Sequence, residues 1–191
     1  MQDGSARTVW ECPWWRVEER QFRGPDGRAR LWYTARRPNP HTVHMLGLTD
    51  DGLTPVLRQW RVPLQAWVWE LPAGLCDREG EPLAEAARRE LLEETGWLAG
   101  ELHHLLCATV SPGLTDELYN AFLCLNLVRQ GEGGGTGSER IELHMVPFDG
   151  LEQHILDAAV RGEWVDAKVL THLRLAQRKL AELKRPASAQ R

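Results

Sequence analysis

Short apolar segments separated by turn-forming residues recur along most of the chain, and this pattern predicts a β-rich domain. Strands are expected, in chain order, at residues 14–22, 29–36, 42–48, 55–60, 67–71, 102–110, 118–128 and 141–147. The turn signal at 23–28, Arg-Gly-Pro-Asp-Gly-Arg, joins the first two strands into a hairpin. Residues 1–13 show no such pattern, so we expect them to be loosely ordered.

Helices are expected at residues 81–95, 151–161 and 165–183. Pro82 suits the first helical position because no N–H is needed there, and Gly96 is a good C-terminal stop. Strands on both sides of one central helix, followed by a helical C-terminus, imply a mixed sheet covered on its faces by helices. The predicted fold class is therefore α/β with a mixed sheet.

The organisation along the chain is expected to change near Pro40, where the segment Arg36-Arg37-Pro-Asn-Pro40 interrupts the strand pattern. We predict a small N-terminal antiparallel β unit at 1–40, a main domain at 41–183 and a frayed tail at 184–191. The Gly-rich stretch at 130–138 is expected to be a flexible loop.

The composition fits an ordinary globular protein, since the 191 residues are 42% hydrophobic and 26% charged. A formal charge of −4 gives no reason to expect nucleic acid or a membrane surface as a partner. The four cysteines form no Cys-x-x-Cys pair, so free thiols are expected. Without a signal peptide pattern or a long apolar stretch, the chain is expected to be soluble and cytoplasmic.

Candidate chemistry lies on the first predicted helix, where Glu90, Glu93 and Glu94 share one strip of surface. Like charges at this spacing destabilise a helix by a few tenths of a kcal/mol per pair. A divalent cation reverses that effect, and Mg²⁺ prefers such oxygen ligands and binds substrate phosphates. The alternative is a solvated salt-bridge ladder formed by Glu85, Arg89 and Glu93.

The residues around this helix favour the metal site. Gly74 is followed by six residues, Glu81, seven residues, and then Arg89-Glu-Leu-Leu-Glu-Glu-Thr-Gly-Trp97. This resembles the Nudix signature, which has five residues between the Gly and the first Glu, so the loop here holds one extra residue. The resemblance implies a Nudix α/β/α sandwich and a hydrolase of diphosphate-linked nucleotides.

The resemblance also implies roles for individual residues. Glu90 and Glu94 would be the main Mg²⁺ ligands, with Glu93 and the Ala73 carbonyl assisting. Arg89 would orient the glutamates, and Glu81 would anchor the loop to the helix. Two or more ions are implied, with Mn²⁺ as an alternative to Mg²⁺, and they would neutralise the diphosphate and activate the attacking water.

Four further segments resemble the ADP-ribose pyrophosphatase branch of this family: Arg58-Gln-Trp-Arg61, Glu70-Leu-Pro-Ala-Gly74, Ser111-Pro-Gly-Leu-Thr-Asp-Glu117 and Gly162-Glu-Trp-Val-Asp-Ala-Lys168. The third segment taken alone is more typical of an ordinary turn between strands. The branch implies cleavage of ADP-ribose to AMP and ribose 5-phosphate, and a homodimer. The substrate-binding residues implied or suggested are Trp15, Trp32, Arg37, Arg61, Leu75, Pro112, Gly113 and Glu117.

Several alternatives remain at this point. Trp15 and Trp32 could flank adenine, or could fill the N-terminal core or a dimer interface. The catalytic base is expected to be Glu139, next to the 131–137 loop, with Glu142 as the second candidate. The substrate could be another nucleoside diphosphate sugar. A non-catalytic ADP-ribose sensor is disfavoured because all three glutamates are present and no basic recognition helix is visible.

Overall fold

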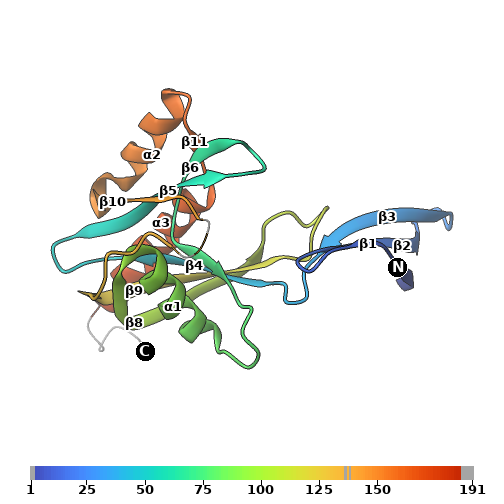
Figure 1. The fold of residues 1–191 in the computed structure, drawn as a ribbon, viewed down its shortest axis with the longest axis horizontal. Helices are drawn as coiled ribbons and strands as arrows, with labels where there is room; N and C mark the ends of the chain where they lie inside the picture. Colours follow the sequence, from blue (N-terminus) through green and yellow to red (C-terminus); the bar gives the residue numbers. More distant parts are fainter. Residues whose placement is uncertain (1–2, 136, 138, 186–191) are drawn as a thin grey trace. The chain divides into compact units, whose positions relative to one another are not determined.

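The computed structural model describes residues 3–135, 137 and 139–185, and these form two compact units (Figure 1). One unit is drawn from Met1–Thr42 and Cys107–Tyr119, and the other from Val43–Leu106 and Asn120–Arg191. The sequence had suggested a boundary near residue 40. The structure differs mainly in adding 107–119 to the N-terminal unit, because this segment hydrogen-bonds to the strand that ends at Arg36. Residues 186–191 of the predicted tail lie outside the described residues.

The first unit is built on an antiparallel three-stranded sheet of β1 (Asp3–Glu11), β2 (Arg16–Arg23) and β3 (Ala29–Arg36), in that order. The predicted hairpin of β2 and β3 is confirmed. The expectation that residues 1–13 are loosely ordered is wrong from Asp3 onward, because the backbone of β1 pairs with β2. Strand β1 forms because its backbone pairs with the edge of β2, and its own sequence has no apolar pattern that would indicate a strand.

A charge network joins β2 to β3. The buried carboxylate of Glu18 accepts hydrogen bonds from Arg16, Arg20 and Arg36 at 2.7, 2.8 and 3.3 Å. Burial opposes ionisation of Glu18, but the three guanidinium groups outweigh it and lower the pKa of its carboxyl to about 2. Arg36 extends the network to Asp116 at 2.6 Å, which fastens the 107–119 segment to β3.

The second unit contains two four-stranded sheets. One has the order β7-β4-β9-β8 and the other β10-β5-β6-β11. The strands are β4 (His41–Gly47), β5 (Leu53–Arg61), β6 (Ala66–Glu70), β7 (Ala73–Leu75), β8 (Trp97–Thr109), β9 (Leu118–Arg129), β10 (Ile141–Pro147) and β11 (Trp164–Val165). Because β11 runs parallel to β6 while β5 runs antiparallel to both β6 and β10, the second sheet is mixed.

The helices of this unit are α1 (Leu83–Thr95), α2 (Leu151–Val160) and α3 (Lys168–Leu183), with a short 3₁₀ turn at Phe148–Gly150. Helix α1 ends as predicted at Gly96, whose φ of 72° is the left-handed conformation that glycine tolerates. Its N-terminus differs slightly, since Pro82 is the N-cap and Leu83 the first helical residue. The short strands β7 and β11 were not predicted.

Strands β4 and β9 are buried on both faces. Val43 and Met45 of β4 pack in one cluster with Ala87 and Leu91 of α1. Leu46 of β4 belongs to the opposite cluster, which contains the buried residues of α2 and α3. Alternate side chains of a strand point to opposite faces, so α1 and the α2–α3 pair lie on opposite sides of this sheet. The predicted α/β fold with helices on the faces of a mixed sheet is confirmed.

Two further expectations can be compared with the structure. The cysteines at 12, 76, 107 and 124 are free thiols, and burial raises the pKa of Cys76 to about 11 and that of Cys124 to about 12. In the part of the chain that the structure describes, no helix has the length and apolar character needed to cross a bilayer.

Candidate active site

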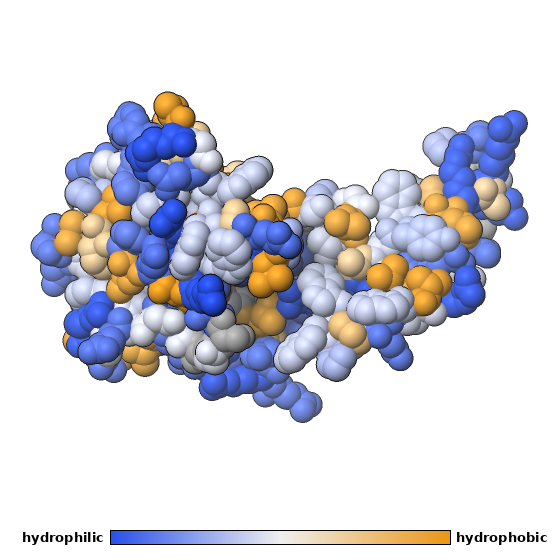
Figure 2. Space-filling view, turned by 45° about the horizontal axis from the view of Figure 1, so that its top comes forward, coloured by the Kyte–Doolittle hydropathy of each residue, from blue (hydrophilic) through white to orange (hydrophobic). Residues whose placement is uncertain are grey.

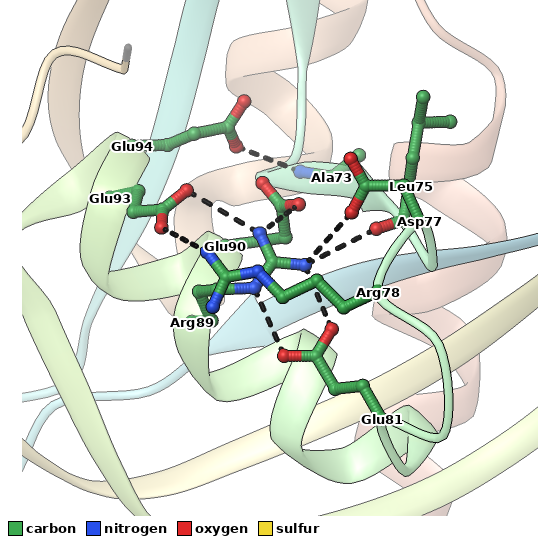
Figure 3. A network of polar contacts seen from close by, with 9 residues as sticks. All are labelled: Ala73, Leu75, Asp77, Arg78, Glu81, Arg89, Glu90, Glu93 and Glu94. Atoms are coloured by element: carbon green, nitrogen blue, oxygen red, sulfur yellow. Dashed lines mark hydrogen bonds and ion pairs between the residues drawn. The ribbon is translucent and has the colours of Figure 1, made fainter.

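Arg89 lies at the centre of the polar network on α1 (Figure 3). Its Nη1 donates to Glu90 Oε1 at 2.6 Å and lies 3.5 Å from Glu93 Oε2. On its other side, Nε and Nη2 donate to the two carboxylate oxygens of Glu81 at 3.1 and 3.0 Å. Arg89 therefore ties the loop residue Glu81 to two acidic residues of the helix, an arrangement that supports the orienting and anchoring roles expected of Arg89 and Glu81.

Glu94 differs from its neighbours because it is buried, with only 3% of its surface exposed. Its Oε2 accepts a hydrogen bond of 2.9 Å from the Ala73 N–H. Burial is the largest cause that raises the pKa of Glu94 well above its usual range, and the nearby charges of Glu139, Glu90 and Glu70 act in the same direction. This contact of Ala73 is made through its N–H, so the role of its carbonyl as a metal ligand stays a prediction.

Gly74 is the point of closest approach between β7 and α1. A Cβ atom at this position would lie 1.9 Å from Cδ and 2.4 Å from Oε1 of Glu90, far inside van der Waals contact. Any other residue at this position would have to displace the Glu90 carboxylate. The signature therefore requires glycine at this position for a steric reason: a side chain here would overlap the Glu90 carboxylate.

The donor set of α1 fits a hard divalent cation. The pKa of Glu90 is raised, first by burial and also by the charges of Glu93 and Asp77, despite the opposing contact with Arg89. A buried carboxylate with a raised pKa is stabilised in its ionised form by a positive charge nearby. Mg²⁺ supplies such a charge and binds oxygen donors of this kind. Among the described residues no ready-made cluster of metal-binding side chains is formed, and Glu90 and Glu93 are turned toward Arg89. Binding a cation would require these two carboxylates to reorient.

A pocket of about 430 Å³ lies beside the ends of β5 and β6 and the start of α3. Two ion pairs line it, Arg61–Glu70 at 2.7 Å and Lys168–Asp166 at 2.5 Å. Burial opposes the charge of Arg61, but the bond to Glu70 and the charges of Glu70, Glu94 and Asp166 raise its pKa. Glu94 is thus the one residue of the acidic strip of α1 whose charge is among the main influences on Arg61.

Lys168 and Asp166 were not among the residues selected from the sequence. Both belong to the Gly162–Lys168 segment, whose resemblance to the ADP-ribose pyrophosphatase branch was the available signal. Leu75, a predicted substrate-binding residue, lies in β7, and its carbonyl accepts a hydrogen bond from Arg89 Nη2 at 3.4 Å.

The two candidate bases have different surroundings. Glu139 packs against Gly135 and its charge raises the pKa of Glu94, which places it near the acidic strip. Glu142 lies opposite Arg58 in the β10–β5 ladder and pairs with it at 3.3 Å. Which of the two acts as the base stays a prediction.

The first unit gathers several of the other predicted substrate-binding residues. Trp32 Nε1 donates to the Gly113 carbonyl at 3.0 Å, and the guanidinium of Arg37 lies 4.2 Å from the centre of the Trp15 ring. Trp32 pairs with Arg20, five residues beyond Trp15 in sequence, or about 16 Å along a strand. The two tryptophans are therefore offset along the β2–β3 hairpin.

The 111–117 segment is ordered against β3. Besides the Gly113 contact, the Ala35 N–H donates to the Leu114 carbonyl at 2.8 Å. Pro112 is exposed and Glu117 is half-buried. Their roles in substrate binding remain predictions.

Comparison with known proteins identifies the class. Residues 38–182 match the family model described as NUDIX domain, and the chain therefore belongs to the Nudix family. The ADP-ribose pyrophosphatase of Bacillus subtilis (strain 168) is 36% identical over 103 residues, which is 54% of each protein. The GDP-mannose pyrophosphatase of Klebsiella pneumoniae is 34% identical over 116 residues, covering 56% of this chain and 57% of that protein.

A solved structure supports the fold over nearly the whole chain. The crystal structure of an ADP compounds hydrolase superposes with a TM-score of 0.80 and covers 97% of this chain and 96% of its own, at 23% sequence identity. The resemblance to Nudix hydrolases of the ADP-ribose pyrophosphatase branch is thus confirmed. The matches to the two pyrophosphatases named above span only a little over half of their length.

Proposed function

We propose that this protein is a Mg²⁺-dependent diphosphatase that hydrolyses ADP-ribose to AMP and ribose 5-phosphate. The observation that carries the proposal is the acidic strip of α1, in which Glu94 is buried with a raised pKa beside the Arg61 pocket. This arrangement provides oxygen ligands for cations next to a cationic side chain that can bind phosphate.

Each group has a distinct task in the proposed reaction. Bound Mg²⁺ supplies positive charge that offsets the diphosphate and makes phosphorus more electrophilic. Glu90, Glu93 and Glu94 would hold the cations, and Arg89 would orient Glu90 and Glu93, with which its Nη1 is in contact. Arg61 and Lys168 would exchange part of their pairing with Glu70 and Asp166 for bonds to the diphosphate.

Glu139 is proposed as the base that accepts the proton of the attacking water. It is carried by the segment that follows the glycines and its charge acts on Glu94, so it lies near the cation-binding carboxylates. The water oxygen forms a bond to one phosphorus as the bond from that phosphorus to the bridging oxygen breaks. The other phosphate keeps the bridging oxygen and leaves with the sugar or the nucleoside.

The choice of ADP-ribose rests on sequence similarity and on the first unit. The pyrophosphatase of B. subtilis named above acts on ADP-ribose, whereas that of K. pneumoniae acts on GDP-mannose, so another nucleoside diphosphate sugar is the second candidate. Trp32 is half exposed and is our candidate for stacking on the base, with Arg37, Pro112, Gly113 and Glu117 as further contacts. Trp15, whose ring centre lies 4.2 Å from the Arg37 guanidinium, is the second candidate for stacking on the base.

We further propose a homodimer formed through the first unit. Several large apolar side chains of its sheet each expose at least 42% of their surface: Val9, Trp10, Leu31, Trp32 and Tyr33. The strand pairing puts Trp10, Leu31 and Tyr33 on one face of the sheet and Trp32 on the other, so the first three are the candidate contacts with a second chain. Apolar residues at the surface appear in orange in Figure 2.

The test is hydrolysis of a panel of diphosphates with Mg²⁺: ADP-ribose, ADP-glucose, GDP-mannose, UDP-glucose, a diadenosine polyphosphate and NADH. We expect the highest kcat/KM for ADP-ribose, with AMP and ribose 5-phosphate as products. A preference for GDP-mannose would replace the substrate but keep the reaction. Tight ADP-ribose binding with no cleavage of any member would identify a sensor instead.

Gly74→Ala is expected to lower kcat about tenfold and to weaken the apparent Mg²⁺ affinity, because the new methyl group displaces the Glu90 carboxylate. The melting temperature should change little, since the overlap is with a movable side chain. Gly150→Ala is the matched control, because its φ is −99° and the nearest atom to the new Cβ would be 3.8 Å away. Equal activity of the two variants would show that Glu90 is not displaced in this way.

A further inference from the structure

The C-terminal end of α1 is closed by a segment that follows β9. The last four carbonyls of a helix have no partner within the helix. Here the Gly96 N–H donates to Leu92, while the N–H groups of Gly135 and Gly134 donate to the carbonyls of Glu93 and Glu94 at 3.1 and 2.8 Å. The remaining carbonyl, that of Thr95, accepts from Arg129 Nη1 at 3.0 Å. We call residues 129–135 the α1 clasp.

The clasp meets the helix backbone directly, at distances that only glycine permits. At Gly133, a Cβ would lie 2.5 Å from the Thr95 carbonyl carbon and 2.7 Å from the Glu94 oxygen. At Gly96, it would lie 2.2 Å from the Gly131 oxygen. Because these neighbours are backbone atoms, no side chain can rotate away to make room. The glycines of residues 131–135 therefore serve close packing in an irregular loop, and the flexibility of this loop stays a prediction.

A guanidinium group fixes the clasp to itself. Arg129 Nη2 donates to the Glu132 carbonyl at 3.0 Å, while Nη1 holds the end of the helix. The same group lies 5.5 Å from the centre of the Trp97 ring. Arg129 thus binds the clasp, the helix end and the first residue of β8 with a single planar group.

The clasp also contacts Glu139. A Cβ on Gly135 would lie 2.6 Å from Glu139 Oε2 and 2.8 Å from the Ile141 side chain, so the Glu139 side chain packs directly over Gly135. The N–H of this same glycine is bonded to the Glu93 carbonyl. A short series of contacts therefore joins the turn of α1 that carries Glu93 and Glu94 to the side chain of Glu139.

We propose that the α1 clasp is a positioning element for the hydrolytic step, with Gly133 and Arg129 as its positioning residues. It holds Glu139 at a fixed separation from the carboxylates of Glu93 and Glu94. This inference rests on the proposed function, in which Glu139 is the base. Since the clasp aligns the base and does not bind the substrate, disturbing it should affect kcat and leave KM nearly unchanged.

The test compares Gly133→Ala with Gly52→Ala in the full chain. Gly133 has φ +76° and Gly52 has φ +80°, but a Cβ on Gly52 would meet no atom within 4 Å. Both variants introduce the same backbone strain, and only Gly133→Ala pushes the clasp off the helix. We expect a loss of kcat of about tenfold or more for Gly133→Ala with KM within about twofold, and kcat within about twofold for Gly52→Ala. Arg129→Ala is a milder second variant, expected to lower kcat several-fold, for use if Gly133→Ala does not fold.

A double-mutant cycle with Glu139→Gln separates positioning from general structural damage. If the clasp acts through Glu139, Gly133→Ala should lower kcat much less in the Glu139→Gln background than in the wild type. Full additivity of the two changes, or equal kcat for Gly133→Ala and Gly52→Ala, would overturn the positioning role while leaving the proposed hydrolase intact. Failure of the wild type to cleave any diphosphate would instead refute the proposed function itself.

Discussion

Glu94→Gln is expected to lower kcat by about 10³-fold, which corresponds to about 4 kcal/mol of transition-state stabilisation. Glutamine has nearly the same shape and can still accept the Ala73 hydrogen bond, but it lacks the charge that a cation requires. In the absence of metal, the variant should be at least as stable as the wild type. The reason is that Glu94 is buried, and in the described part of the chain no cationic side chain forms a salt bridge with it.

Thermal unfolding with and without Mg²⁺ measures this difference. A ligand that binds only the folded state raises its stability, so Mg²⁺ should raise the melting temperature of the wild type and not that of Glu94→Gln. Glu85→Gln is the control on the same helix, because Glu85 is exposed and paired with Arg88. A Glu94→Gln variant that turns over normally would contradict the metal assignment, and one that unfolds in the absence of metal would give Glu94 a structural role instead.

The fold could be predicted where the local sequence pattern was strong. Helix α1 has a stop at Gly96 and an apolar face that includes Ala87 and Leu91, and its prediction needed no knowledge of the surroundings. Strands β4 and β9 were predicted for the same reason, since apolar runs of this kind are typical of strands buried on both faces. Strand β1 could not be predicted, because its residues pair with β2 through the backbone, which leaves no signal in the side chains.

The acidic strip of the candidate site could be predicted because its residues are close in sequence. Glu90, Glu93 and Glu94 fall on one side of a helix by its period alone. The positions of Lys168 and the α1 clasp could not be predicted in this way. They depend on contacts of β11, α3 and the end of β9 with residues that are distant in sequence. The glycines at 131–135 also have two meanings in sequence, since both flexible linkers and close backbone contacts favour glycine.

The extra residue between Gly74 and Glu81 marked the one departure from the family signature. In the structure the two ends of this loop keep the contacts that the signature implies. Gly74 leaves space for Glu90, and Glu81 forms two hydrogen bonds with Arg89. The added length is accommodated between these ends, where Gly80 has a φ of +74° and open space around it.

Glu139→Gln is expected to lower kcat by about 10²-fold with little change in KM, because a general base acts in the transition state and contributes on the order of 10²-fold or more. Steady-state kinetics with ADP-ribose and saturating Mg²⁺ measures the effect. Affinity for ADP-ribose, measured by calorimetry with Ca²⁺ in place of Mg²⁺, should remain within about threefold of the wild type, since the carboxylate is not required to hold the substrate.

Glu142→Gln is the matched control for this prediction. Glu142 is three residues away in the same segment, but it is paired with Arg58 on β5. Its replacement removes one exposed ion pair, which contributes at most about 1 kcal/mol to stability, and should leave kcat within about twofold. If Glu142→Gln is the damaging change and Glu139→Gln is harmless, the base is Glu142. The Arg58 pair would then have to open before each turnover, because Arg58 occupies one carboxylate oxygen of Glu142 at 3.3 Å.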